Sequence, residues 1–139
     1  TPLLRHQNGL LYVAFSPDDQ RIVTSAYDNT AAVWETQTGR LVARWTNQQA
    51  RVLSPQFAPD GRRIVTASFD RTVWVWDAAT AQPVVGPLEH KGRVWRAVFS
   101  PDADRIVAGA GRVGESGHVV VWDARTGRRT PPGGAGRAP

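Results

Sequence analysis

The 139-residue sequence contains no cysteine and no methionine, and Lys91 is its one lysine. Without cysteine the chain has no disulfide, no thiolate metal ligand and no cysteine nucleophile. Histidine occurs three times, and no histidine has a second one four positions away, the spacing of a helical metal site. We therefore expect neither a bound metal nor a cofactor.

Long apolar runs are also missing. No stretch approaches the length that a membrane-spanning helix needs, and no signal-peptide pattern follows Thr1. Since the sequence does not open with methionine, a targeting segment in an upstream portion would not be visible here. We expect a cytoplasmic location and no membrane contact.

Positive charge comes almost entirely from arginine. The formal net charge is +5, and arginine supplies 16 of the 17 basic residues. A basic surface suits nucleic acid or an acidic protein. However, the arginines form no single stripe, and single-strand binders need exposed aromatic residues interleaved with them. We therefore favour a compositional bias, with arginines on solvated loops, over a nucleic-acid site.

One stretch of sequence occurs three times. Residues 57–77 read FAPDGRRIVTASFDRTVWVWD, and similar stretches occupy residues 15–35 and 99–123. The residues that recur at a spacing of 42 are Phe15, Phe57, Phe99, Pro17, Pro59 and Pro101. The tryptophan spacing is 42 from Trp34 to Trp76 and 46 from Trp76 to Trp122. A fixed period of this size indicates a repeat architecture.

The repeat resembles the WD40 repeat, in which a His, a Phe-Ser-Pro-Asp turn, a bend Asp and a Trp-Asp pair recur every roughly 40–45 residues. Each such repeat corresponds to one blade of a propeller. The resemblance implies an all-β fold, a partial β-propeller of about three four-stranded antiparallel blades. The three repeats would be residues 6–46, 47–88 and 89–129. Residues 1–5 would be a strand of a preceding or closing blade.

The strands are expected at the same places in each repeat. They are residues 10–15, 21–26, 30–35 and 40–45, then 51–57, 63–67, 72–77 and 83–88, then 93–99, 105–109 and 117–123. Ile64 and Val65 are adjacent and so point to opposite faces, which predicts sheets buried on both sides. We expect the third blade to be incomplete, because residues 130–139 are rich in proline and glycine and favour a flexible tail.

The resemblance also implies a hydrogen-bonded set in each repeat, made of a His, a Ser or Thr, the bend Asp and the Trp. The matching residues are His6, Thr24, Asp28 and Trp34, then Gln48, Thr66, Asp70 and Trp76, then His90 and Trp122. In the third repeat Ala108 takes the hydroxyl position and Ser116 stands where Asp would. His118 precedes a tryptophan and not a phenylalanine, so we assign it to no set.

A His, a hydroxyl and an Asp are also the parts of a hydrolase triad. We interpret the set as structural, because it recurs in every repeat and because buried polar groups need partners. No residue is predicted to be catalytic.

By the same resemblance, residues near the bends and near the start of each inner strand lie on the top rim of a propeller. Those residues are Leu11, Tyr27, Arg51, Leu53, Phe69, Arg93, Trp95 and Arg96. Exposed aromatic residues and arginines anchor protein interfaces. Tyr27, Phe69 and Trp95 could equally well cover neighbouring blades, and the sequence leaves both interpretations open.

The sequence therefore predicts a scaffold for protein–protein interaction that is not an enzyme. One alternative is a sensor or regulatory region of a larger bacterial-type signalling kinase or NTPase. Nucleic-acid binding through the arginines is a weaker alternative.

Closure is the remaining question, because three blades fall short of the four to eight of known propellers. We expect the open ends to expose apolar residues such as Val23 and Val107. Further WD40 blades should cover them, in the same polypeptide or in a homo-oligomer in which residues 1–5 of one copy complete the third blade of another.

Overall fold

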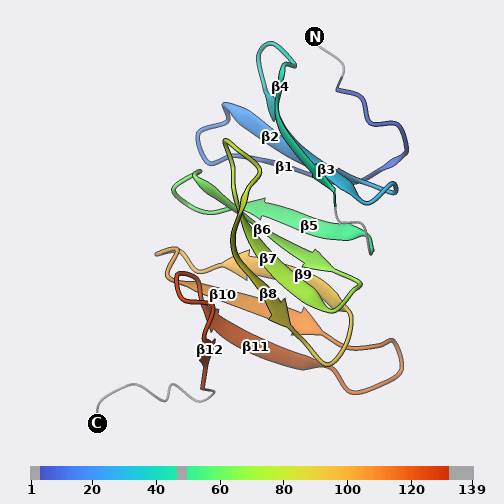
Figure 1. The fold of residues 1–139 in the computed structure, drawn as a ribbon, viewed down its shortest axis with the longest axis vertical. Coiled ribbons are helices and arrows are strands. Elements are labelled where there is room, and N and C mark those ends of the chain that lie inside the picture. The colour runs from blue at the N-terminus through green and yellow to red at the C-terminus, as the bar shows by residue number, and fades with distance from the viewer. Residues whose placement is uncertain (1–3, 47–49, 132–139) are drawn as a thin grey trace.

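The structure, a computed structural model, describes residues 4–46 and 50–131 (Figure 1). All regular elements in this part of the chain are β-strands, and it holds no helix long and apolar enough to cross a membrane. The strands form three four-stranded sheets in which strands consecutive in sequence pair antiparallel. Figure 1 shows the three sheets following one another along the long axis of the molecule.

Strand bounds repeat from sheet to sheet. The first sheet contains β1 (Leu10–Phe15), β2 (Arg21–Ala26), β3 (Thr30–Glu35) and β4 (Leu41–Thr46). The second contains β5 (Val52–Phe57), β6 (Arg63–Ser68), β7 (Thr72–Asp77) and β8 (Pro83–Glu89). The third contains β9 (Val94–Phe99), β10 (Arg105–Ala110), β11 (His118–Asp123) and β12 (Arg129–Thr130). The eleven predicted strands agree with these bounds to within one residue at each end.

The third sheet has the fourth strand that we expected to be missing. Strand β12 pairs through Thr130 with Val121 and through Arg129 with Trp122. It is short because Pro131 follows, and proline has no N–H for a ladder bond. Residues 1–3 and 132–139, which hold most of the predicted first strand and of the predicted tail, lie outside the described residues, and Leu4 and Arg5 form no strand.

Side chains close the turn between the first two strands of a sheet. In the first sheet Ser16 Oγ donates to Asp18 Oδ1 at 2.6 Å, and the Gln20 N–H donates to the same carboxylate at 3.0 Å. In the third sheet Ser100 Oγ donates to Asp102 Oδ1 at 2.6 Å. The serine hydroxyl is the main reason that the pKa of each aspartate lies below its usual value. These local bonds stabilise the Ser-Pro-Asp turns that the sequence predicts.

Apolar side chains fill the two gaps between neighbouring sheets. The gap between the first and second sheets holds Val23, Ala31, Val33, Ala43, Trp45, Val52, Phe57 and Ile64. The gap between the second and third holds Leu53, Val65, Ala67, Val73, Val75, Leu88, Val94, Ala97 and Ile106. Ile64 and Val65 therefore point into different gaps, as predicted, and the second sheet is buried on both faces.

Each sheet has a leading face, which points toward the preceding sheet, and a trailing face, which points toward the following one. Phe57 and Ile64 lie on the leading face of the second sheet. Phe15 holds the same position on the first sheet, which no described sheet precedes, and is 60% exposed. Val107 lies on the trailing face of the third sheet and is 38% exposed, as expected. The expectation for Val23 was wrong, because it lies on a trailing face that the second sheet covers completely.

Replacing Trp76 with alanine should lower the free energy of unfolding by about 3–5 kcal/mol. The partly buried indole stacks on Trp45 across the first gap, with ring centroids 5.4 Å apart, and donates to Thr66 at 2.9 Å. Urea unfolding measures the loss. The control is Val84→Ala, at a side chain that is 53% exposed, which should change stability by no more than about 0.5 kcal/mol. An equal decrease in the free energy of unfolding for the two variants would show that Trp76 does not contribute to the core.

Candidate functional site

In the first sheet the predicted polar set is assembled around the hydroxyl of Thr24, which is 1% exposed. Trp34 Nε1 donates to Thr24 Oγ1 at 2.9 Å, and His6 Nε2 lies 2.5 Å from the same oxygen. The His6 ring also meets Trp34 edge-on, with centroids 5.8 Å apart. One hydroxyl therefore ties the segment before β1 to both β2 and β3.

The link from His6 to Asp28 passes through Thr30, which the sequence analysis missed. His6 Nδ1 lies 3.2 Å from Thr30 Oγ1, and that hydroxyl donates to Asp28 Oδ1. All four groups are satisfied when Nδ1 of a neutral imidazole carries the proton and Nε2 accepts from Thr24. The signal was present in the sequence, because a threonine stands four residues before both Trp34 and Trp76.

The second sheet repeats this arrangement. Trp76 Nε1 donates to Thr66 Oγ1 at 2.9 Å, and the hydroxyl of Thr72 donates to Asp70 Oδ1. The N–H of Thr72 donates to the same carboxylate oxygen at 3.1 Å. Gln48 lies outside the described residues, so its membership of the set stays a prediction.

In the third sheet the tryptophan N–H finds its hydrogen-bond acceptor without a hydroxyl. Ala108 replaces the threonine, and Trp122 Nε1 donates directly to His90 Nε2 at 3.1 Å. His118, which we assigned to no set, stands four residues before Trp122, in the place of Thr30 and Thr72. Its ring stacks on that of His90, with centroids 5.9 Å apart and an angle of 21°. Ser116, at the Asp position, is exposed on the loop.

Burial keeps these histidines neutral. It lowers the pKa of His6, an effect that the nearby Asp28 carboxylate opposes. It lowers the pKa of His90 to about 4, and the charges of His118 and Arg129 act in the same direction. His90 is only 9% exposed, and its Nδ1 has no hydrogen-bond partner among the described residues.

The free energy of unfolding should therefore fall as the pH drops from about 6.5 to about 4, the interval between the ordinary and the folded-state pKa of His90. In this interval the unfolded chain binds a proton that the folded chain does not, so protonation favours unfolding. One such group contributes at most about 1.4 kcal/mol per pH unit. Urea unfolding at several pH values measures the slope.

The His90→Gln variant should show a shallower slope than the wild type, with part of the slope left because His6 acts in the same direction. The slope separates titration from a general loss of stability, which would shift the curve without flattening it. An unchanged slope would mean that His90 does not titrate in this interval.

The same burial argues against nucleophilic chemistry by the threonines. Thr24 and Thr66 are 1% and 3% exposed, and each hydroxyl already accepts from an indole N–H. A catalytic hydroxyl must reach a substrate beside a base and an oxyanion site. The sets therefore act as internal ties between strands.

The accessible candidate site is the top rim, the edge of the sheets formed by the bends after β2, β6 and β10. The guanidinium of Arg51 lies over the Tyr27 ring at 4.7 Å, and that of Arg93 lies over the Phe69 ring at 5.0 Å. Phe69 also meets Trp95 edge-on at 4.9 Å. Tyr27 and Trp95 stay 46% and 43% exposed. The aromatic residues thus pack on their neighbours and still present surface.

Three other predicted rim residues lie elsewhere or are less accessible. Leu53 is 4% exposed in the core between the second and third sheets, so its predicted place on the surface was wrong. A bulge in β5, with Ser54 at φ 49°, shifts the register of this strand next to Leu53. Leu11 packs partly against the same core, and Arg96 pairs with Gly109 on the trailing face of the third sheet.

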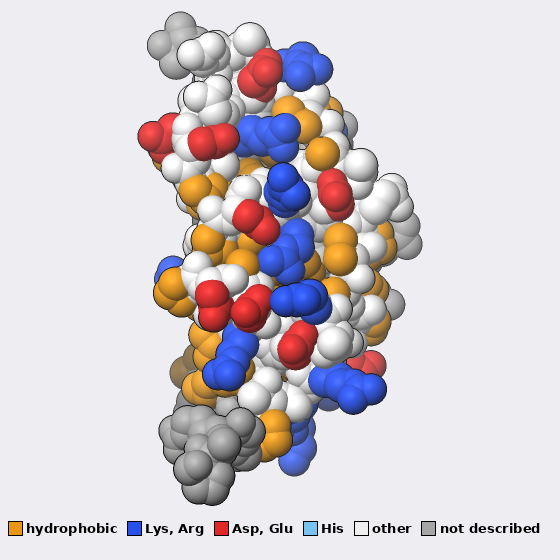
Figure 2. Space-filling model, turned by 90° about the vertical axis from the view of Figure 1, so that its left-hand side faces the viewer, with side chains coloured by type: hydrophobic (Ala, Val, Ile, Leu, Met, Phe, Trp, Pro, Cys, Tyr) orange, Lys and Arg blue, Asp and Glu red, His pale blue; other side chains and the backbone are white. Residues whose placement is uncertain are grey.

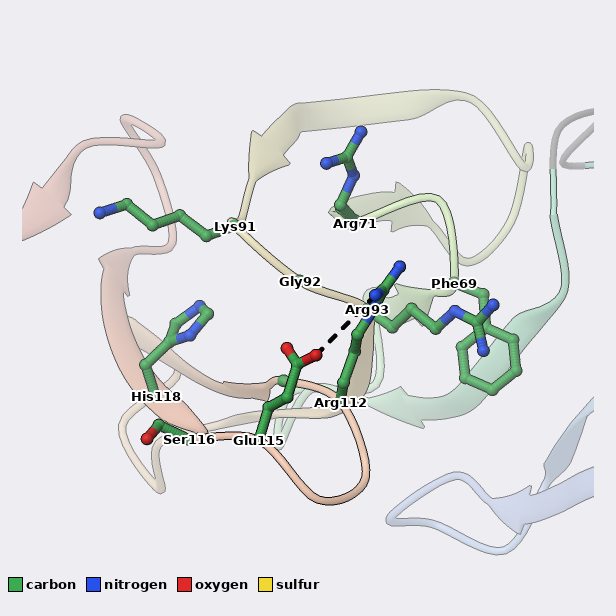
Figure 3. Close-up of a pocket in the computed structure, with 10 residues that line it drawn as sticks. Phe69, Arg71, Lys91, Gly92, Arg93, Arg112, Glu115, Ser116 and His118 are labelled. Carbon is green, nitrogen blue, oxygen red and sulfur yellow. Dashed lines mark ion pairs between the residues drawn. The ribbon is translucent and has the colours of Figure 1, made fainter.

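A basic pocket of about 630 Å³ opens on the top rim between the second and third sheets (Figure 3). Its cationic lining residues are Arg71, Lys91, Arg93 and Arg112. Glu115 is the one carboxylate in the lining, and it pairs with Arg112 at 3.9 Å. Of the four cations the sequence analysis identified only Arg93, because the others come from segments that only the fold brings together.

The opposite rim has a different charge pattern. Figure 2 shows acidic and basic side chains interleaved along the edge that carries the Ser-Pro-Asp turns. Ion pairs there join Arg63 to Asp60 at 3.7 Å and Arg125 to Asp104 at 3.6 Å. The positive charge of this rim is therefore largely matched by acidic neighbours, whereas that of the basic pocket is not.

The sequence matches the family described as "WD domain, G-beta repeat" over residues 2–35, 39–77 and 83–123. The chain belongs to the WD40 repeat family. Its first, second and third sheets are three consecutive blades of a β-propeller architecture. WD40 domains generally mediate protein–protein interactions and are typically non-catalytic.

Solved structures of two computationally designed proteins resemble these blades. The designed Ika4 protein has a TM-score of 0.80 and 31% identity, over 94% of this chain and 75% of that chain. The designed Ika8 protein has a TM-score of 0.75 and 27% identity, over 89% of this chain but 36% of that chain. The comparison with curated proteins found no match.

The third blade should be the loosest of the three WD40 blades. It lacks the buried hydroxyl, leaves His90 Nδ1 unpaired among the described residues, and carries a longer, glycine-rich loop at residues 111–117. We expect backbone amides of this loop to exchange with deuterium faster than those of the bend at residues 69–71. Exchange measured by mass spectrometry compares the two segments in one sample, and slower exchange in the loop would contradict the prediction.

Proposed function

We propose that this WD40 chain is a non-catalytic interaction module whose top rim binds an acidic segment of a partner protein. The observation that carries the proposal is the basic pocket, where four cationic side chains face one carboxylate. Carboxylates of a partner would find charge complementarity there that the opposite rim, with both signs interleaved, does not offer.

One feature of the pocket and one beside it favour an ordered contact. Arg93 is held by its position over the Phe69 ring, so it loses less conformational freedom on binding than a solvated arginine would. Beside the pocket, Trp95 is fixed by a hydrogen bond from Nε1 to the carbonyl of Gly111, a lining residue, at 2.9 Å. Arginine and tryptophan beside an apolar ring are typical of residues that dominate protein interfaces.

The same contacts disfavour nucleic acid. Single-stranded nucleic acid binds by stacking bases on free aromatic faces. Here Arg51 covers a face of Tyr27, and Arg93 covers a face of Phe69. An extended acidic peptide needs no such platform.

Binding of a fluorescein-labelled peptide of alternating glutamate and glycine, followed by fluorescence anisotropy, tests the proposal. Arg93→Glu and Arg112→Glu should each raise the Kd at least about tenfold, because each places a like charge against the peptide. The matched control is Arg62→Glu, an exposed arginine of the opposite rim, which should leave the Kd unchanged.

Three outcomes would count against the proposal: no measurable peptide binding, equal effects of the variants on both rims, or tighter binding of an oligothymidine than of the peptide. The last would favour nucleic acid as the partner.

Glu115→Gln should have the opposite effect on peptide binding. It removes the single carboxylate of the pocket and releases Arg112 from its ion pair. Since both side chains of that pair are well exposed, we expect a modest decrease in Kd, about two- to five-fold. The same titration at low and at high salt should show the difference shrinking as salt screens the charges. Weaker binding by this variant would contradict a peptide contact governed by the positive charge of the pocket.

A further inference from the structure

The leading face of the first blade exposes residues that the other two blades bury. Leu10 is 50% exposed, whereas Val52 and Val94, at the same place in the second and third blades, are 2% and 0% exposed. Phe15 is 60% exposed, against 9% for Phe57. This face therefore has the composition of a blade-to-blade contact surface, and no blade within residues 4–46 and 50–131 covers it.

The trailing face of the third blade shows the complementary pattern. Val119 is 69% exposed, whereas Ala31 and Val73, at the same place in the first and second blades, are fully buried. Val107 is 38% exposed, against 0% for Val65. Inside the molecule a trailing face always meets a leading face, so the two free faces are the two halves of the contact that the chain already makes twice.

We propose that these faces bind each other between two copies of this chain, head to tail. Two copies of the three-blade unit supply six blades, within the four to eight of known propellers, and three copies would exceed that range. A head-to-tail contact whose rotation closes gives a ring with both junctions filled. This inference goes beyond the acidic partner proposed above, and its two faces adjoin the basic pocket only through the loop that holds Arg112.

Side-chain size supports the match at one point of the junction. Gly109 lies in an apolar pocket of about 530 Å³ lined by Trp95, Val113 and Val119, and a Cβ added to Gly109 would meet no atom within 4 Å. The residue equivalent to Gly109 in the second blade is Ala67, which shares the core with Val94 of the third blade. Where two copies meet, Gly109 of one would face Leu10 of the other. This pair has a smaller and a larger side chain than Ala67 and Val94, so the total side-chain volume is similar.

An arginine supports the match at a second point. Arg63 of the second blade lies over the ring of Phe99 at 5.1 Å and donates to the Ala103 carbonyl at 3.2 Å, both in the third blade. The equivalent residues at the free ends are Arg105, Phe15 and Asp19. Asp19 has the backbone conformation of Ala103, with φ 61° against 62°. Arg105 of one copy would thus lie over Phe15 of the next, beside a carboxylate that the internal junction lacks.

The strand exchange that we expected from residues 1–5 is not needed for this contact. Strand β12 already occupies the edge of β11 at Val121 and Trp122. The two copies would join through the faces of their end blades and not through a shared strand.

Sedimentation velocity of the full 139-residue chain tests the proposal. The wild type should sediment at twice the mass of one chain at micromolar concentration. Arg105→Glu and Asp19→Arg should each dissociate the dimer, raising its Kd about tenfold or more, because both junctions then hold like charges. Arginine tolerates the backbone at position 19, since Arg71 adopts φ 73° in this chain.

An equimolar mixture of the Arg105→Glu and Asp19→Arg variants should restore the dimer. One junction then joins the introduced glutamate of the first variant to the introduced arginine of the second, and the other junction keeps the wild-type pair. Only a head-to-tail arrangement predicts this rescue. A wild type that stays monomeric at high concentration, or a mixture as dissociated as its components, would overturn the proposal.

Gly109→Val provides a second, uncharged test. The added side chain enters open space, so the fold should be kept, as circular dichroism and a thermal melt would verify. It should abolish dimer formation by filling the pocket that Leu10 would occupy. The matched control is Val84→Ser, which changes an exposed valine of β8 away from both end faces and should leave the dimer intact. Dimer formation by Gly109→Val as strong as that of the wild type would contradict the proposed contact.

Discussion

The packing of apolar sheet faces against one another is the constraint on which this structure depends. Each blade presents an apolar leading face and an apolar trailing face, and in the described part of the chain only the second blade has both covered. Burial of apolar area stabilises a fold by about 25 cal/mol per Å². An uncovered apolar face lacks this stabilising free energy, and a neighbouring blade would supply it. Phe15 at one end and Val119 at the other are exposed because each lies on an apolar face that is not packed against a described blade.

The polar sets work within this packing. A buried hydroxyl such as Thr24 would be costly alone, but it is satisfied by Trp34 and His6 and so ties three segments together. The third blade replaces the hydroxyl by a direct hydrogen bond from Trp122 to His90, and the ring of His118 stacks on that of His90. Among the described residues the third blade has the fewest of these ties, and it forms one side of the basic pocket at which we propose that a partner binds.

Charge is distributed so that the two rims differ. Ion pairs such as Arg125 with Asp104 balance the opposite rim, while the pocket beside Phe69 keeps a net positive lining. The proposed partner site and the proposed junction between copies share Arg112 in the linings of their pockets, but the charged pairs that test them lie apart. Arg105 and Asp19 belong to the opposite rim, and Arg93 and Arg112 to the top rim, so each interaction can be changed without the other.

The sequence by itself determined the repeat, the strand bounds and the turns, because side-chain alternation and turn residues such as Asp18 act over a few neighbouring positions. It also identified the pairs of Trp34 with Thr24, Trp76 with Thr66 and Trp122 with His90, but not the contacts of Thr30 and His118. Only the tertiary structure decided which faces are covered, which buries Val23 and Leu53 and exposes Leu10. It alone assembled the basic pocket, since its cations come from three separate segments of the chain. Burial and proximity of this kind depend on the packing of whole blades, which no local pattern encodes.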